Sequence, residues 1–174
     1  MSSRIFQKGL LTLFCYNVTC LKLSSKEIIG DLIKVLLEEL DIEFWSLGSM
    51  TFKKESLRGL EPDQCFYIEN EAIIRGKGRI DLAIDPPADL ALEIEITSRT
   101  HPEIYAALGV PELWRFEKGK LQINILTDGQ YQEVSTSPTF PEFPLVELIP
   151  QFLAESKISG RNATIKKFRR LIAK

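Results

Sequence analysis

Residues 89–98 read Asp-Leu-Ala-Leu-Glu-Ile-Glu-Ile-Thr-Ser and are the most informative stretch of this 174-residue chain. The even positions from Leu90 to Ile96 are all branched and apolar, whereas the odd positions from Asp89 to Thr97 are polar or small. This period of two predicts a β-strand with one buried face. Glu93 and Glu95 are therefore expected on the same side of the strand, about 7 Å apart at a rise of roughly 3.3 Å per residue.

A second acid, Asp63, opens another predicted strand thirty positions before Glu93. An acid at the start of one strand and an acid inside a later strand can share one hard cation such as Mg²⁺, which prefers carboxylate oxygens. A metal held in this way polarises a phosphate and makes hydroxide from water, as the cutting of a phosphodiester requires. The residues alone leave a second interpretation open, in which Asp63 caps a turn after Pro62 and Glu93 lies on a solvated strand face.

The pair Pro62-Asp63, followed by Glu93-Ile94-Glu95, resembles the motif of the PD-(D/E)XK nuclease superfamily. The wider pattern is similar to the Uma-two family, whose bacterial members are described as restriction endonucleases. This similarity runs from about residue 24 to about residue 155. It rests on segments that occur in the family's order: GLEPDQCFYI at 59–68, RIDL at 79–82, DPPADL at 85–90 and YAALGVPELW at 105–114.

The resemblance implies an α/β (α+β) fold with a restriction-endonuclease-like core, in which helices flank a central mixed β-sheet. It also implies an endonuclease that depends on Mg²⁺ or Mn²⁺ and hydrolyses DNA phosphodiester bonds. Asp63 and Glu93 would bind the metal together with the backbone carbonyl of Ile94.

Two departures from the pattern leave the activity open. Glu95 stands where the superfamily motif usually has lysine, and an acid there could serve as a third ligand or a general base instead. Arg99 is the nearest replacement cation, ahead of Lys77 and Arg79, but arginine cannot act as a base near pH 7. The family also usually carries an acid before its first long helix, whereas residues 10–23 contain none.

Three functions are compatible with these residues. The first is the metal-dependent endonuclease, with Asp63, Glu93, Glu95 and Arg99 as catalytic residues. The second is a catalytically incomplete protein of the same fold that binds nucleic acid or a protein partner without cutting. The third is a dimerising interaction protein whose acids merely solvate the sheet. Binding without cleavage separates the second from the first, and no binding at all favours the third.

Composition is ordinary for a single soluble globular domain, with 44% hydrophobic and 26% charged residues. No apolar run approaches the roughly 18 residues that a membrane helix needs, so we expect a cytoplasmic protein without membrane contact. A single histidine and three cysteines without paired spacing argue against a zinc site. The sequence leaves a homodimer open.

Charge is distributed unevenly along the chain. The last fourteen residues, from Arg161, hold six basic residues and no acid, whereas the rest carries 16 basic and 24 acidic residues, a net charge of −8. An acidic body with a basic tail suits a protein that gathers cations at one place and touches phosphate at another.

Apolar spacing and turn residues predict the order of the elements. We divide the single domain, 1–174, into an atypical N-terminus at 1–23, a nuclease-like core at 24–155 and a basic C-terminal helix at 161–174. Trp45 and Trp114 are expected in the core. Helices are predicted near 24–40, 101–108 and 162–172, strands within 10–23 and near 42–47, 49–53, 64–69, 112–117, 120–127 and 130–134, and connections at 54–61, 75–89 and 138–150.

Overall fold

The structure is a computed structural model that describes residues 3–48, 52–54, 57–60, 62–95 and 102–173. Runs of strands are separated by single helices, and two helices end the described chain. In chain order they are α1 (Ser3–Glu39), β1 (Trp45–Gly48), β2 (Phe52–Lys54), β3 (Leu57–Leu60), β4 (Gln64–Tyr67), α2 (Glu71–Ile74), β5 (Leu90–Glu95), α3 (Pro102–Leu108), β6 (Glu112–Glu117), β7 (Lys120–Thr127), β8 (Gln130–Val134), α4 (Leu145–Ser159) and α5 (Arg161–Ile172).

Six strands form one mixed sheet in the order β1-β4-β5-β6-β7-β8. β5 and β6 are parallel, as expected for two strands that are joined through a helix, while the other neighbours are antiparallel. β2 and β3 form a separate antiparallel pair. The expected mixed sheet flanked by helices is therefore confirmed, and β5 lies inside it between β4 and β6.

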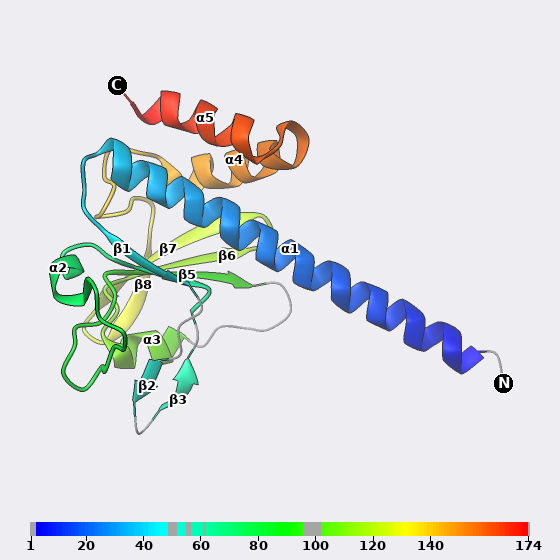
Figure 1. Cartoon of the computed structure of the whole chain (residues 1–174), viewed down its shortest axis with the longest axis horizontal. Helices are drawn as coiled ribbons and strands as arrows, with labels where there is room; N and C mark the ends of the chain where they lie inside the picture. Colours follow the sequence, from blue (N-terminus) through cyan, green and yellow to red (C-terminus); the bar gives the residue numbers. More distant parts are fainter. Residues whose placement is uncertain (1–2, 49–51, 55–56, 61, 96–101, 174) are drawn as a thin grey trace.

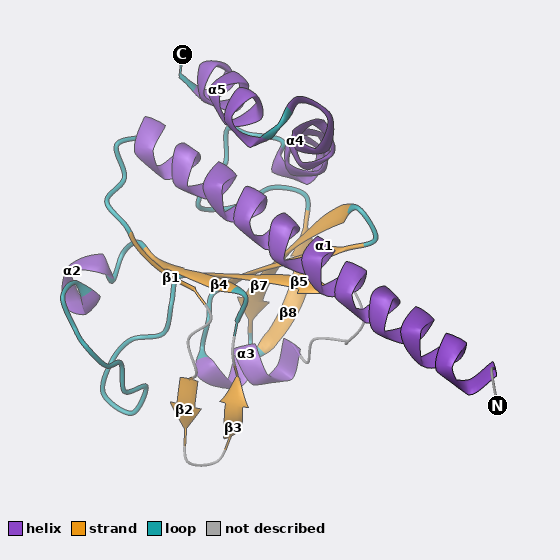
Figure 2. Cartoon of the chain, turned by 45° about the vertical axis from the view of Figure 1, so that its right-hand side comes forward, coloured by secondary structure: helices purple, strands orange, loops and turns teal. Residues whose placement is uncertain are grey.

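Helices cover both faces of the six-stranded sheet. Figure 1 shows α1, α4 and α5 on one side and α3 on the other, and the rotated view in Figure 2 shows the same layers. The larger core lies on the α1 side, where Leu90, Leu92 and Ile94 of β5 pack against apolar residues of α1, α4 and α5. On the α3 side, Ala91 and Tyr105 belong to a smaller cluster.

The prediction of strands within residues 10–23 is wrong, because α1 is one continuous helix that starts at Ser3. Apolar residues in this stretch also recur at helical spacing, as in Leu10, Leu13 and Leu21, and no glycine or proline interrupts the chain between Leu10 and Gly30. The start of the helix near Ser24 is wrong for the same reason, since a serine caps a helix only where the chain before it is not helical. The N-terminal part of α1 extends away from the sheet (Figure 1).

Three further expectations are wrong. The connection at 54–61 contains β3, which pairs with β2 as a local ribbon. The connection at 138–150 contains the start of α4, whose buried Leu145, Ile149, Phe152 and Leu153 follow helical spacing despite Pro150. Trp45 lies at the start of edge strand β1 and is 39% exposed, whereas Trp114 is fully buried as predicted.

Candidate active site

Glu93 and Glu95 project from the same face of β5, as the period of two predicts. That face is the one toward α3, because Ala91 packs there with Tyr105 while the alternate residues enter the larger core. Glu93 and Glu95 are each only 7% exposed. The expectation of one buried face is therefore wrong, since helices cover both faces and all of β5 is buried.

Asp63 lies opposite Glu93 when the pairing of β4 with β5 is continued by one residue. Gln64 pairs with Leu92 and Cys65 with Ala91, so the antiparallel register brings Asp63 next to Glu93 on the same face. Side chains opposite each other in such a pair have Cβ atoms about 4.5–5.5 Å apart. The Asp63 carboxylate also accepts a hydrogen bond of 2.9 Å from the backbone N–H of Ile94, which fixes its position beside β5.

Glu93 is an acid of this site whose ionisation the fold changes. Burial raises its pKa to about 7, and the neighbouring carboxylates of Asp63 and Glu95 act in the same direction. A hydrogen bond donated by the Tyr105 hydroxyl and the positive charge of Lys22 oppose the rise in pKa. A carboxyl group with a pKa near neutrality is expected at a functional site more often than at a structural one.

Glu95 is held by an arginine from the neighbouring strand. Both Nε and Nη2 of Arg115 lie 2.7 Å from Glu95 Oε1, and the arginine side chain is 18% exposed. Arg115 stands beside Glu93 in the parallel register of β5 and β6, yet its guanidinium donates to Glu95. Glu95 therefore has a committed cationic partner, and its role as a third ligand or general base stays a prediction.

The structure brings a lysine to this site that the sequence did not indicate. Lys22 of α1 has its Nζ atom 2.9 Å from Asp63 Oδ2. The sequence pattern favours strands within residues 10–23 and gives no reason to place Lys22 at the site. The replacement cations that the sequence suggests are therefore Lys77, Arg79 and Arg99, which flank β5. The helical spacing of the same stretch is the signal that could have placed Lys22 on α1, facing the sheet.

Among the residues that the structure describes, the remaining predicted cations do not join the site. Arg99 and His101 lie outside the described residues. Lys77 forms an ion pair with Asp85 in the connection before β5, and Arg79 is exposed. Three basic residues of the tail form ion pairs with acids of α1 and α4: Arg161 with Asp31, Lys167 with Glu155, and Arg169 with Glu38 and Glu39.

The donor set suits a hard divalent cation. Asp63 and Glu93 offer carboxylate oxygens from adjacent strands, and the Lys22 ammonium already places one positive charge against Asp63. Within the described ranges, no group of three or more His, Cys, Asp or Glu side chains forms a metal cluster. A cation here would therefore be held by two carboxylates, a backbone carbonyl and water, a set that suits Mg²⁺ or Mn²⁺ better than zinc.

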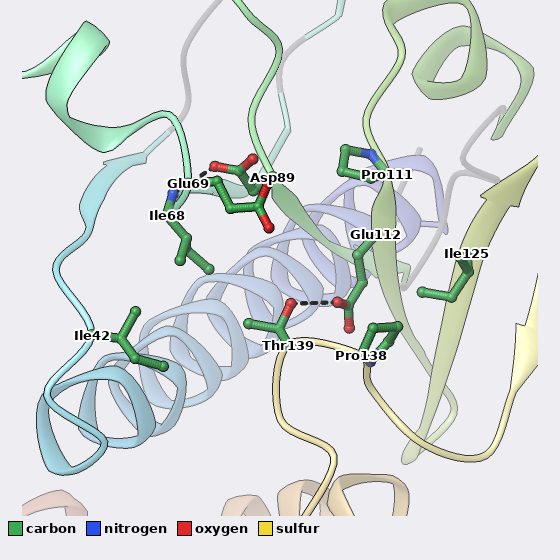
Figure 3. Close-up of a pocket in the computed structure, with 9 residues that line it drawn as sticks. All are labelled: Ile42, Ile68, Glu69, Asp89, Pro111, Glu112, Ile125, Pro138 and Thr139. Atoms are coloured by element: carbon green, nitrogen blue, oxygen red, sulfur yellow. Dashed lines mark hydrogen bonds between the residues drawn. The ribbon is translucent and has the colours of Figure 1, made fainter.

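A separate pocket with a volume of about 420 Å³ lies at the opposite end of β5 (Figure 3). Two of its carboxylates already have donors: Glu112 accepts hydrogen bonds of 2.6 Å from Trp114 and from Thr139, and Asp89 accepts bonds from the backbone and side chain of Asn70. These hydrogen bonds hold the chain together around the starts of β5 and β6. None of the predicted site residues lines it.

The sheet, its helices and the acids at the end of β5 define a protein of the restriction-endonuclease-like class. The chain belongs to the Uma2 family, described as "Putative restriction endonuclease", whose family model matches residues 22–156. Among solved structures, it is similar to the crystal structure of a "putative nuclease belonging to DUF820" from Anabaena variabilis ATCC 29413. The two chains share 11% sequence identity with a TM-score of 0.50, over 75% of this chain and 82% of the other.

No curated protein matches the chain. Among the described residues, no helix is both long enough and apolar enough to cross a membrane.

Proposed function

We propose that this protein is a metal-dependent endonuclease that hydrolyses DNA phosphodiester bonds at the site formed by Asp63 and Glu93. The observation that carries the proposal is the register of β4 on β5, which brings these two acids opposite each other at one end of the sheet. Membership of the Uma2 family and the restriction-endonuclease-like fold support the same reaction.

Asp63, Glu93 and the carbonyl of Ile94 would hold the cation, Mg²⁺ or Mn²⁺. When bound, such an ion polarises the phosphate and lowers the pKa of a coordinated water. The protein's own groups prepare the ligands: the Ile94 N–H orients Asp63, and the Tyr105 hydroxyl orients Glu93. Arg115 pairs with Glu95 beside them, which gives this buried acid a cationic partner.

Cleavage of plasmid DNA in Mg²⁺ and in Mn²⁺ tests the proposal. Asp63→Asn and Glu93→Gln remove one ligand charge each while keeping the side-chain shape, and each should abolish cleavage. Glu69→Gln is the matched control, since Glu69 is an exposed acid near the start of the chain segment that follows β4. Cleavage that survives both site substitutions would show that the activity lies elsewhere.

A second function is favoured by one observation, the engagement of Glu95 by Arg115. Because Glu95 is paired with Arg115 and position 95 carries no lysine, the chain could bind DNA at the same site without cutting it. Retardation of DNA in a gel by the wild-type protein, with no product in either metal, would support this catalytically incomplete form. For either function, we also propose that the protein resides in the cytoplasm and assembles as a homodimer.

A further inference from the structure

The two cations of the candidate site, Arg115 and Lys22, differ in how accessible they are to a bound anion. Arg115 makes two short contacts with Glu95 and is largely buried, so its positive charge is already used. Lys22 contacts Asp63 through its Nζ atom, and its side chain is 35% exposed. Of these two cations in the described part of the chain, Lys22 is thus the more accessible to a molecule arriving from solvent.

Lys22 is also placed by a rigid element. The later part of α1 packs on the sheet through fully buried residues such as Ile29, Leu32 and Leu36, which fixes the axis of the helix over β5. The lysine stem then bridges from this helix to Asp63, which directly precedes β4. A lysine side chain has a flexible four-carbon stem with three donors, so its ammonium can exchange one anion for another nearby without movement of the helix.

The balance of charge shows what this ammonium would do during the proposed reaction. Asp63 and Glu93, when both are ionised, carry a charge of −2, which one divalent cation only neutralises. With Lys22 the loaded site is positive by one unit, and without Lys22 it is neutral. A phosphodiester is an anion, and negative charge on the transferring phosphoryl group must be stabilised in the transition state.

We propose that Lys22 is the phosphate-contacting cation of this site: it pairs with Asp63 in the metal-free chain and turns to the substrate phosphate once Asp63 is taken up as a metal ligand. This inference rests on the proposed function, and it assigns to α1 a role in the reaction besides support of the sheet.

The proposal predicts two effects of opposite sign. Replacement of Lys22 frees Asp63 and removes a positive charge, so Lys22→Met should bind Mn²⁺ about fivefold more tightly in calorimetry, as expected for loss of a partly exposed ion pair. The same substitution should weaken binding of a short DNA duplex in Ca²⁺ about fivefold, measured by fluorescence anisotropy with a gel to confirm that the duplex is intact. Lys22→Arg keeps the charge and should keep most of the duplex affinity.

Lys34→Met is the matched control, because Lys34 also lies on α1, is 30% exposed and pairs with an acid, Asp31. It should change neither affinity. If Lys22 only supported the structure, Lys22→Met would displace Asp63 and lower the affinities for Mn²⁺ and for the duplex together. Urea unfolding of each variant separates this case, because Lys22→Met should remain folded.

Unchanged duplex binding by Lys22→Met, or weaker binding of Mn²⁺, would overturn the inference. Its failure can be told apart from failure of the proposed function. If Asp63→Asn and Glu93→Gln abolish cleavage while Lys22→Met binds the duplex like the wild type, only the role of Lys22 is lost. If neither acid affects binding of Mn²⁺, the metal site itself is wrong.

Discussion

The hydroxyl of Tyr105 on α3 donates a hydrogen bond to the carboxylate of Glu93 on β5, and both side chains are buried. This contact joins the helix on one face of the sheet to the acid that the sequence singled out. It favours the ionised form of Glu93 against the burial that raises its pKa. Under the proposed function, Tyr105 would be a positioning residue that keeps the carboxylate ready to bind a cation.

Tyr105→Phe tests this relationship. Without the donated hydrogen bond, the pKa of Glu93 should rise further, because burial and the nearby acids remain. Protons then compete with metal up to a higher pH, so the midpoint of the pH dependence of Mn²⁺ affinity should shift upward. Calorimetric titrations at a series of pH values measure this midpoint, and an unshifted midpoint with lower stability alone would show that Tyr105 only fills space.

Stability of the metal-free protein should fall as pH rises from about 4.5 to about 7. The pKa of Glu93 is 4.5 in the unfolded chain, the ordinary value for glutamate, and about 7 in the folded chain, so the folded state binds more protons across this interval. The loss is at most about 3 kcal/mol, from about 1.36 kcal/mol for each unit by which the two pKa values differ. Urea unfolding at pH 5 and pH 8 should show that Glu93→Gln reduces this decline, whereas Glu69→Gln leaves it as in the wild type.

Gly30→Ala should destabilise the fold next to the site. A Cβ atom at Gly30 would lie 1.8 Å from the Oε1 atom of Gln64, a buried residue adjacent to Asp63. Overpacking of this kind typically costs about 1–3 kcal/mol, against a gain of up to about 1 kcal/mol in helix propensity. In a Gln64→Ala background the clash is absent, so Gly30→Ala should become neutral or stabilising in urea unfolding. Equal effects in both backgrounds would contradict the close approach.

Glu95→Lys restores the lysine of the superfamily motif in sequence but should not produce a working site alone. It would bring a second cation against Arg115, and it would remove the partner of a largely buried guanidinium. Breaking such a pair typically costs about 3–5 kcal/mol. Glu95→Lys combined with Arg115→Glu restores the pair with reversed charges, and urea unfolding should show partial recovery. A stable single variant would indicate that the Glu95–Arg115 pair contributes little to folding.

Much of the sheet follows from the sequence because alternation of apolar residues is a local property. The predicted strands at 112–117, 120–127 and 130–134 coincide with β6, β7 and β8, and the helix near 101–108 with α3. The local pattern is ambiguous in two helices: before Ser24 in α1 the apolar residues fit both alternation and helical spacing, and in α4 Pro150 stands inside the helix.

The candidate site is only partly accessible to sequence analysis, because its contacts join segments that are far apart in the chain. The alternation of residues with a period of two predicts that Glu93 and Glu95 share a face of the strand. The partners of these acids, however, come from other elements. Lys22 reaches Asp63 from a helix 41 positions earlier, and Arg115 reaches Glu95 through the parallel register of β6. No spacing rule predicts contacts between segments so far apart, because they depend on the register and on how α1 crosses the sheet.

The most direct measurement is a calorimetric titration of Mn²⁺ into the wild type, Asp63→Asn, Glu93→Gln and the double variant. If the two acids hold one ion, the wild type should bind a single ion, and each single substitution should weaken binding at least about tenfold. The double substitution should then lose less than the sum of the two free-energy losses, because each single variant has already dismantled the shared site. Mn²⁺ affinity equal to that of the wild type in both single variants would contradict a metal site at Asp63 and Glu93.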